Sequence, residues 1–306
     1  MARIVVAEAI AAAGISALRI AGHEIHDFAG QPLEALLAAL ANADALIVRS
    51  QVQVDAALIA AGPQLKIIGR AGVGIDNIDA VAAERARVRV VNAPNGNTIA
   101  AAEQTFALLL ALARHVPRGD ASVRAGEWIR GELKGFELRG KRLGIVGLGR
   151  IGQAVAKRAA AFEMKVAASD PVVTATQASV LGVTLQTFDQ ILTDSDIITL
   201  HVPALGASPL IGTAEIAKMK RGAVLLNVAR GSLVDEQALA AALASGALGG
   251  AGIDVFASEP PTGSPLLTAP HTVLAPHLGA QTVDAQIAVA VEVADQIIKF
   301  FAAPHG

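Results

Sequence analysis

Three glycines near the middle of the chain have the spacing of a phosphate-binding turn. Gly147, Gly149 and Gly152 follow a short apolar run at residues 141–146 and precede an Ala-rich stretch at residues 151–162. In a strand–turn–helix unit, such glycines allow a tight turn, close approach of a pyrophosphate and close helix packing. The free N–H groups that begin the helix then bind the phosphates. The pattern predicts a dinucleotide site.

An acidic residue ends the next predicted strand. Asp170 follows the apolar run at residues 165–169, where its carboxylate is expected to accept hydrogen bonds from the adenosine ribose and to repel the extra phosphate of NADP. No Arg or Lys occurs in residues 171–174, so the predicted cofactor is NAD. A solvated turn acid is the alternative reading of Asp170.

Three more reactive side chains come shortly after apolar runs. Arg230 has a planar guanidinium that suits a substrate carboxylate. Glu259 lies in an acidic loop, and His277 could exchange a proton near neutral pH. Taken singly, each has a plain alternative: a surface Arg, an ordinary loop acid and a structural His. His201 also ends an apolar run and is expected to line the cofactor site.

Composition limits the possible classes of protein. The chain has 306 residues, 53% hydrophobic and 17% charged, which predicts two well-packed domains and excludes disorder. The net charge of −2 gives no sign of binding to nucleic acid or a membrane surface. There is no apolar run of about 18 residues and no signal-peptide pattern at the N-terminus. The absence of cysteine fits a cytoplasmic protein, and no residue cluster has metal-ligand spacing.

Apolar runs alternate with Ala-rich stretches in two blocks, which predicts an α/β fold with two doubly wound parallel sheets. In the first block the predicted strands cover residues 3–7, 45–48, 65–69 and 88–92. In the second they cover residues 143–146, 165–169, 197–201, 223–228, 250–254 and 272–275. A long helix is predicted at residues 100–115, ended by Pro117 and Gly119.

The last predicted helix, residues 283–301, begins after the second sheet is complete. We therefore expect it to return to the first block, so that the chain crosses twice between domains. The prediction is a flavodoxin-like substrate domain over residues 1–96 and 283–306, and a Rossmann NAD-binding domain over residues 97–282. A ligand cleft is expected between them, with the paired crossings as a hinge.

Together these pieces resemble the D-isomer-specific 2-hydroxyacid dehydrogenases, and within them the phosphoglycerate dehydrogenase branch most closely. The family pattern is a mid-chain GxGxxG followed by an Arg, a Glu and a His, which here fall on Arg230, Glu259 and His277. The resemblance covers nearly the whole chain. Its most specific strings are residues 48–50, 69–79, 95–98, 200–203 and 234–236.

The resemblance implies oxidation of 3-phospho-D-glycerate to 3-phosphohydroxypyruvate with NAD, the first step of the phosphorylated route to serine. It implies that His277 is the base for the C2 hydroxyl, that Glu259 holds the ring and favours its charged form, and that Arg230 clamps the carboxylate. Asp254 is expected to contact the nicotinamide end. The implied cofactor-binding residues are Val73, Gly147, Gly149, Arg150, Ile151, Gly152, Asp170, His201, Val202, Pro203, Val228, Ala229, Arg230, Asp254, His277, Gly279 and Ala280.

The choice of substrate depends on Arg49 and Arg70, which end predicted strands of the first domain and are expected to bind the phosphate. Surface ion pairs are the alternative role for both. Arg130 lies in an arm that, in related enzymes, crosses to the second subunit of a homodimer and can reach its phosphate site. The predicted substrate-binding residues are Arg49, Ser50, Arg70, Ala71, Gly72 and Arg130.

Two other functions remain open. A glyoxylate or hydroxypyruvate reductase, or another D-2-hydroxyacid dehydrogenase, would share Arg230, Glu259 and His277 without needing Arg49 and Arg70. An NADH-sensing binding protein, like the corepressor relatives of the family, could also keep these residues. The chain ends after the last predicted helix and thus resembles a short form without a serine-sensing domain. Gln281 replaces the usual Ser after the catalytic His, which affects a small contact near the hinge.

Overall fold

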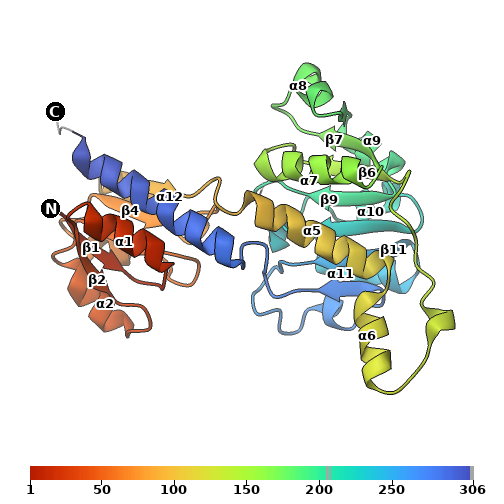
Figure 1. Ribbon diagram of the computed structural model, residues 1–306, viewed down its shortest axis with the longest axis horizontal. Coiled ribbons are helices and arrows are strands. Elements are labelled where there is room, and N and C mark those ends of the chain that lie inside the picture. Colours follow the sequence, from red (N-terminus) through yellow and green to blue (C-terminus); the bar gives the residue numbers. More distant parts are fainter. Residues whose placement is uncertain (205, 207, 304–306) are drawn as a thin grey trace. The chain divides into compact units, whose positions relative to one another are not determined.

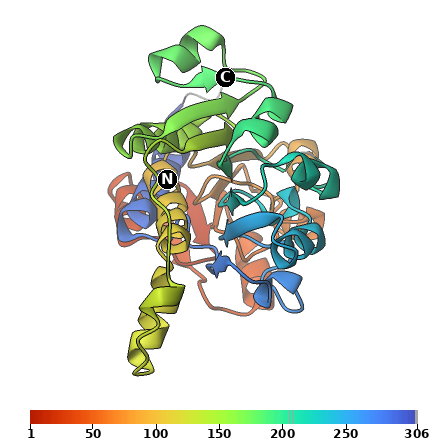
Figure 2. The ribbon, with the colours of Figure 1, turned by 90° about the vertical axis from the view of Figure 1, so that its right-hand side faces the viewer.

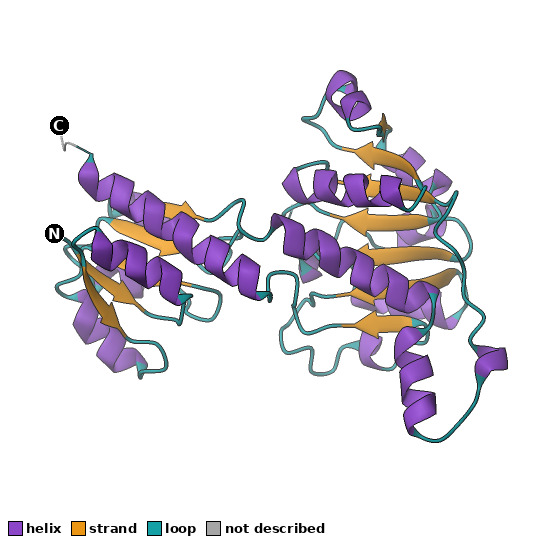
Figure 3. Cartoon of the chain, viewed as in Figure 1, coloured by secondary structure: helices purple, strands orange, loops and turns teal. Residues whose placement is uncertain are grey.

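The computed structural model describes residues 1–204, 206 and 208–303. The chain divides into two compact units, Met1–Thr98 with Ala280–Gly306 and Ile99–Gly279. The sequence-based boundaries lie after residues 96 and 282, and residues 304–306 of the predicted substrate domain lie outside the described residues. Each unit is a parallel sheet covered by helices on both faces, as the alternating pattern of apolar and Ala-rich runs predicts (Figure 3).

The first unit has a five-stranded parallel sheet in the order β2-β1-β3-β4-β5, which is the flavodoxin-like order. Its strands are β1 (Arg3–Val6), β2 (Glu24–Asp27), β3 (Ala45–Val48), β4 (Ile67–Arg70) and β5 (Arg89–Asn92). Its helices are α1 (Ala12–Ile20), α2 (Leu33–Leu40), α3 (Ala56–Ala60), α4 (Ala80–Arg85) and α12 (Val283–Ala302). Strand β2 was not predicted, because this edge strand, Glu-Ile-His-Asp, has a single apolar residue.

Helices α1 and α12 cover one face of the first sheet, and α2, α3 and α4 cover the other. Close packing of α12 depends on two glycines. A Cβ at Gly14 of α1 would lie 2.7 Å from the carbonyl oxygen of Ala290, and a Cβ at Gly69 of β4 would lie 2.5 Å from Cγ1 of Val293. The last helix of the chain is therefore packed into the core of the first unit.

The second unit has a seven-stranded parallel sheet in the order β12-β11-β10-β9-β6-β7-β8. This is the Rossmann order with one strand added at the end. Its strands are β6 (Arg142–Val146), β7 (Lys165–Ser169), β8 (Thr184–Leu185), β9 (Ile197–Leu200), β10 (Ala223–Asn227), β11 (Leu248–Ile253) and β12 (Thr272–Leu274). The prediction of six strands missed β8, which has only two residues and therefore no recognisable apolar run.

Helices α5 and α7 cover one face of the second sheet, and α9, α10 and α11 cover the other. The α-helices are α5 (Thr98–Ala113), α6 (Val116–Arg124), α7 (Arg150–Ala161), α8 (Ala175–Val180), α9 (Phe188–Asp194), α10 (Thr213–Lys218) and α11 (Glu236–Ala244). Three short 3-10 helices are η1 (Arg130–Glu132), η2 (Gly231–Leu233) and η3 (Pro265–Leu267).

The helix predicted at residues 100–115 ends near the expected place, at Ala113. The prediction that Pro117 and Gly119 end it was wrong, because both residues lie in a second helix. A new helix, α6, begins at Val116 after His115 turns the chain with a φ of +52°. Pro117 lies in its first turn, where a missing N–H removes no helical hydrogen bond. Pro117 and Gly119 therefore belong to α6 and do not end α5, which stops at Ala113 before the left-handed His115. Helix α6 projects away from the second sheet (Figures 1 and 2).

Among the described residues, no single helix is long and apolar enough to cross a membrane. Helices α5 and α6 satisfy that test only as a pair, which is bent by 61° at the junction.

The packing of α1 against α12 can be tested by replacing Gly14, because steric overlap and helix propensity change the free energy of unfolding in opposite directions. Replacing Gly14 with Ala should destabilise the protein by about 1–3 kcal/mol, because the new Cβ overlaps the backbone of Ala290. Helix propensity alone would stabilise it by about 1 kcal/mol. Thermal unfolding measures the difference, and Ser16→Ala on the exposed side of α1 is the control. A more stable Gly14→Ala variant would contradict the described packing.

Candidate active site

The predicted site residues of the second unit follow its strands in the order in which the strands lie in the sheet. Because the strands are all parallel, their carboxyl ends share one edge, with neighbouring strands about 4.8 Å apart. Residues far apart in the sequence thus form one row along this edge. In spatial order they are His277 after β12, Asp254 after β11, Arg230 after β10, His201 after β9, Gly147 after β6 and Asp170 after β7.

His277 and Glu259 form a hydrogen-bonded pair at one end of this row. Nδ1 of His277 lies 2.8 Å from Oε2 of Glu259, and about half of the imidazole is exposed. The other carboxylate oxygen of Glu259 accepts a hydrogen bond of 3.1 Å from the N–H of Phe256, which fixes its direction. With Nδ1–H directed to the carboxylate, Nε2 is the ring nitrogen that can take up and release a proton.

The turn that carries His277 is built around the buried Asp254. The N–H groups of three successive residues, His277, Leu278 and Gly279, donate to the main-chain oxygen and the two carboxylate oxygens of Asp254, each at 2.8 Å. Gln104 of α5 donates a fourth bond, at 3.0 Å from its Nε2. This set of bonds holds His277 in the left-handed region, with a φ of +56°.

Burial raises the pKa of the Asp254 carboxyl, while the hydrogen bonds from Leu278, Gly279 and Gln104, together with the charge of His277, act to lower it. The side chain is fully buried, with three acceptor positions used by its own chain. The observed role of Asp254 in the site is to hold the turn that carries His277. Its predicted contact with the nicotinamide end stays a prediction.

Arg230 is positioned by a buried amide at the end of the neighbouring strand. Nδ2 of Asn227 donates to the carbonyl oxygen of Arg230 at 2.8 Å, and Oδ1 of Asn227 accepts from the N–H of Ala229 at 3.1 Å. A Cβ at Gly231 would lie 2.0 Å from the carbonyl oxygen of Phe256. The loop that carries Arg230 therefore packs directly on the loop that carries Glu259.

The glycine turn has the geometry that its spacing predicts. Gly147 has a φ of +93°, and a Cβ there would lie 2.6 Å from the carbonyl oxygen of His201. A Cβ at Gly152 would lie 2.1 Å from the carbonyl oxygen of Gly147. A Cβ at Gly149 would meet no atom within 4 Å, and no side chain caps the helix that begins at Arg150 and Ile151. The open space over Gly149 and the uncapped N–H groups fit a bound pyrophosphate.

Asp170 is held against this turn. Its carboxylate accepts hydrogen bonds from the N–H groups of Leu148, Val172 and Val173 at 2.8, 2.8 and 3.1 Å. Burial acts to raise the pKa of Asp170, but these three bonds hold it below its usual value. The carboxylate is therefore charged at neutral pH and retains about one of its four acceptor positions. Asp170 is therefore hydrogen-bonded to the glycine turn, and its contact with the adenosine ribose stays a prediction.

His201 is a buried histidine next to the glycine turn. Its Nε2 lies 2.9 Å from the hydroxyl of Thr199, and burial lowers the pKa of its imidazole to about 4. The ring is therefore neutral near pH 7 and unsuited to proton exchange there. Val202 contacts the glycine turn, since a Cβ at Gly147 would lie 2.7 Å from its Cγ1, and Pro203 follows directly. The predicted role of this segment in lining the cofactor site stays a prediction.

Other predicted residues belong to the first unit. Arg49 and Ser50 follow β3, while Arg70 to Val73 end or follow the neighbouring β4. The guanidinium of Arg70 lies over Gly72, where any Cβ would be 1.6 Å from Nη1. Ala71 is buried beneath this segment. These residues form a second, cationic group at the carboxyl edge of the first sheet.

The three remaining predicted residues are Ala280, Val228 and Arg130. Ala280 belongs to the first unit, where its carbonyl oxygen accepts from Nε2 of Gln286 at 2.9 Å. Val228 contacts the turn of His277, because a Cβ at Gly279 would lie 3.2 Å from its Cγ1. Arg130 is exposed in η1, close in sequence to Trp128, whose side chain is 82% exposed.

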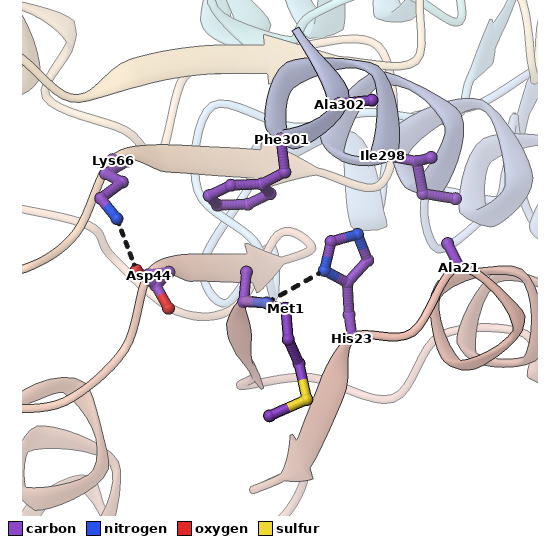
Figure 4. A pocket seen from close by; sticks show the side chains of 9 residues that line it. Met1, Ala21, His23, Asp44, Lys66, Ile298, Phe301 and Ala302 are labelled. Atoms are coloured by element: carbon purple, nitrogen blue, oxygen red, sulfur yellow. Dashed lines mark hydrogen bonds and ion pairs between the residues drawn. The ribbon is translucent and has the colours of Figure 1, made fainter. Parts of the chain in front are cut away.

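A cavity of about 360 Å³ in the first unit lies at the other end of the sheet (Figure 4). Its lining includes His23, Asp44 and Lys66, which precede β2, β3 and β4, whereas Arg49 and Arg70 lie at the carboxyl ends of β3 and β4. Nζ of Lys66 is paired with Asp44 at 2.8 Å. This cavity is therefore separate from the predicted substrate residues. Within the described residues, no three His, Asp or Glu side chains gather to hold a metal ion.

Comparison with known proteins identifies the family. Residues 106–279 match the model of the D-isomer specific 2-hydroxyacid dehydrogenase NAD binding domain, which is more than half of the chain. This chain belongs to the D-isomer specific 2-hydroxyacid dehydrogenase family. The predicted family and the predicted NAD cofactor are thereby confirmed, and so are the two parallel-sheet α/β domains.

Individual relatives agree with this family. D-3-phosphoglycerate dehydrogenase of Archaeoglobus fulgidus is 46% identical over 298 residues, covering 97% of this chain and 56% of that protein. The chain spans about half the length of the curated relatives that it matches. The crystal structure of the TT0316 protein from Thermus thermophilus superposes with a TM-score of 0.89 at 36% identity, covering 99% of this chain and 98% of that one. NAD-dependent formate dehydrogenase from Staphylococcus aureus, solved in complex with NAD, superposes with a TM-score of 0.85 at 31% identity, covering 98% of this chain and 96% of that one.

Several positioning residues of the candidate site were not predicted from the sequence. Glu236 accepts from the N–H of Ala257 at 2.8 Å and from the hydroxyl of Ser264, and so fixes the loop around Glu259. It belongs to a string noted only for its resemblance. Asn227 could have been suspected, because it is a polar residue directly at the end of an apolar run. Gln104 carries no such signal, since its contact with Asp254 spans 150 residues.

The open space over Gly149 gives a test of the predicted cofactor site. Gly149→Ala should lower stability by about 1 kcal/mol or less, since its Cβ meets no protein atom, yet weaken NADH binding about tenfold or more. Fluorescence titration with NADH and thermal unfolding measure the two effects. Gly152→Ala is the comparison, because its Cβ collides with Gly147 and should destabilise the fold itself. Unchanged NADH affinity in Gly149→Ala would contradict the assignment.

Proposed function

We propose that this chain catalyses the NAD-dependent oxidation of 3-phospho-D-glycerate to 3-phosphohydroxypyruvate, the reaction that opens the phosphorylated route to serine. The observation that carries the proposal is the 2.8 Å contact between His277 and Glu259 at the same sheet edge as Arg230 and the glycine turn. An acid–base pair, a carboxylate-binding guanidinium and an NAD site are the parts that oxidation of a 2-hydroxy acid needs. The relatives named D-3-phosphoglycerate dehydrogenase support the choice of substrate.

NAD+ bound at the glycine turn would accept the hydride that leaves C2 of the substrate. Nε2 of His277 takes the proton of the C2 hydroxyl as the carbonyl forms, and returns it in the reverse direction. Glu259, on Nδ1, holds the ring in the required tautomer and stabilises its positive charge. Arg230 binds the substrate carboxylate and thereby orients C2.

Arg49 and Arg70 are proposed to recognise the phosphate of the substrate. Each follows or ends a strand of the first sheet, and the two strands are neighbours. A hydrogen bond to a charged group contributes about 1.5–3 kcal/mol, so each arginine could provide roughly a tenfold to hundredfold preference for a phosphorylated substrate. This preference distinguishes the proposal from a reductase of glyoxylate or hydroxypyruvate.

A homodimer formed through the segment of α6 and η1 is proposed as well, with Arg130 reaching the phosphate site of the second subunit. The 82% exposure of Trp128 supports it, because a large aromatic side chain so exposed is typical of a surface that is covered in an assembly. A cytoplasmic location is also part of the proposal, supported by the absence of cysteine.

The proposed acid–base role of His277 can be tested by substitution. His277→Asn should lower kcat by about 10²–10⁴-fold, because general acid–base catalysis is lost, while Asn tolerates the left-handed backbone at this position. NADH affinity should stay within about threefold of the parent protein, since the glycine turn is untouched. His271→Asn, an exposed left-handed His in the same unit, is the matched control. A nearly normal kcat for His277→Asn would refute the assignment.

The substrate is tested by comparing reduction of 3-phosphohydroxypyruvate, hydroxypyruvate, glyoxylate and 2-oxoglutarate with NADH. We expect a clear preference in kcat/KM for the phosphorylated acid, and Arg49→Ala should reduce that preference about tenfold to hundredfold. Arg85→Ala, an exposed arginine of α4, is the control. A preference for an unphosphorylated acid would assign a different dehydrogenase. Tight NADH binding without turnover of any of the four acids would indicate a binding protein.

A further inference from the structure

The loop that carries Arg49 is held by one carboxylate. Oε2 of Glu8 accepts hydrogen bonds from the N–H groups of Arg49 and Val52 at 2.7 and 3.2 Å. Oε1 of Glu8 accepts a third bond, at 3.0 Å, from the N–H of Gln51. Three of the four backbone amides in residues 49–52 therefore point toward the same side chain, and both of its oxygens are used.

The order of strands in the first sheet explains this placement. Strand β1 pairs with β3, and the N–H of Ala7 donates to the carbonyl oxygen of Ile47 at 2.9 Å. Glu8 therefore leaves the sheet beside the start of residues 49–52. Asn77 binds the same loop through its Nδ2, which donates to the carbonyl oxygens of Arg49 and Val52 at 3.0 and 2.7 Å.

These contacts change how an anion can be recognised at this sheet edge. A set of neighbouring backbone amides is a common anion-binding site, but here a fixed negative charge already uses them. Glu8 leaves only the N–H of Ser50 in this loop, so a phosphate there depends mainly on side chains, for which Arg49 is half-buried and Ser50 is exposed. The direction of the Arg49 side chain depends on the backbone that Glu8 fixes.

We infer that Glu8 is a positioning residue for substrate specificity, which holds residues 49–52 so that Arg49 can bind the phosphate of the substrate. The inference rests on the proposed function of Arg49. A carboxylate is the side chain that suits this place, because both oxygens accept and neither carries a hydrogen. Glutamine would direct an amide NH₂ group at a backbone N–H, and aspartate is shorter by one methylene.

The kinetic test compares Glu8→Gln with Glu34→Gln in the full chain, since Glu34 is an exposed glutamate of α2 in the same unit. In reduction with NADH, Glu8→Gln should raise KM for 3-phosphohydroxypyruvate about tenfold, while kcat and the KM for hydroxypyruvate stay within about twofold. Glu34→Gln should match the parent protein. An unchanged preference for the phosphorylated acid in Glu8→Gln would overturn the inference, as would an equal loss with both substrates.

Hydrogen exchange gives a second measurement that needs no substrate. The amides of Arg49, Gln51 and Val52 should exchange about tenfold faster in Glu8→Gln than in Glu34→Gln or the parent protein, because their acceptor is weakened. Unchanged exchange would overturn the role of Glu8 even in an enzyme that prefers 3-phosphohydroxypyruvate. If exchange accelerates but the parent protein shows no preference for that acid, the proposed substrate is refuted, and Glu8 holds the loop without serving phosphate specificity.

Discussion

The proposed chemistry depends on one buried carboxylate, because Asp254 holds the turn from which His277 extends. An unpaired charge in the interior is strongly destabilising, and a positive φ at a non-glycine residue is also unfavourable. Here each unfavourable feature compensates for the other. The left-handed turn at His277 directs the N–H groups of Leu278 and Gly279 at the buried carboxylate of Asp254, and these hydrogen bonds in turn stabilise the turn. The position of the His277 imidazole therefore depends on both the Asp254 carboxylate and the turn that binds it.

The parallel sheet supplies the rest of the arrangement. Six of the seven strands of the second unit carry a site residue in the loop that follows them, so six short segments separated by long stretches of sequence form one row along the same edge. Hydrogen bonds from neighbouring polar side chains then fix the loops that carry the reactive residues. Asn227 directs Arg230, and Glu236 fixes the loop of Glu259, so the reactive side chains are held by neighbours that take no part in the proposed reaction.

The sequence was informative where one residue type has a strong local consequence. The glycines of the turn and the apolar runs of the central strands both constrain the backbone by themselves. Prediction failed where the signal lies in tertiary contacts. The edge strands β2 and β8 are polar or very short, so no periodicity marks them. Gln104 is an ordinary helix residue until α5 packs beside Asp254, and the hold of Glu8 on residues 49–52 appears only once β1 and β3 are paired.

The attachment of Asp170 to the glycine turn affects how this enzyme family could evolve a different coenzyme. The same carboxylate that faces the predicted ribose position also receives the N–H groups of Leu148, Val172 and Val173. Exchanging it for a neutral residue to admit an extra phosphate would leave those three amides without their acceptor and loosen the pyrophosphate turn at the same time. A substitution of Asp170 in this chain is therefore expected to change the stability of the glycine turn together with the choice of coenzyme.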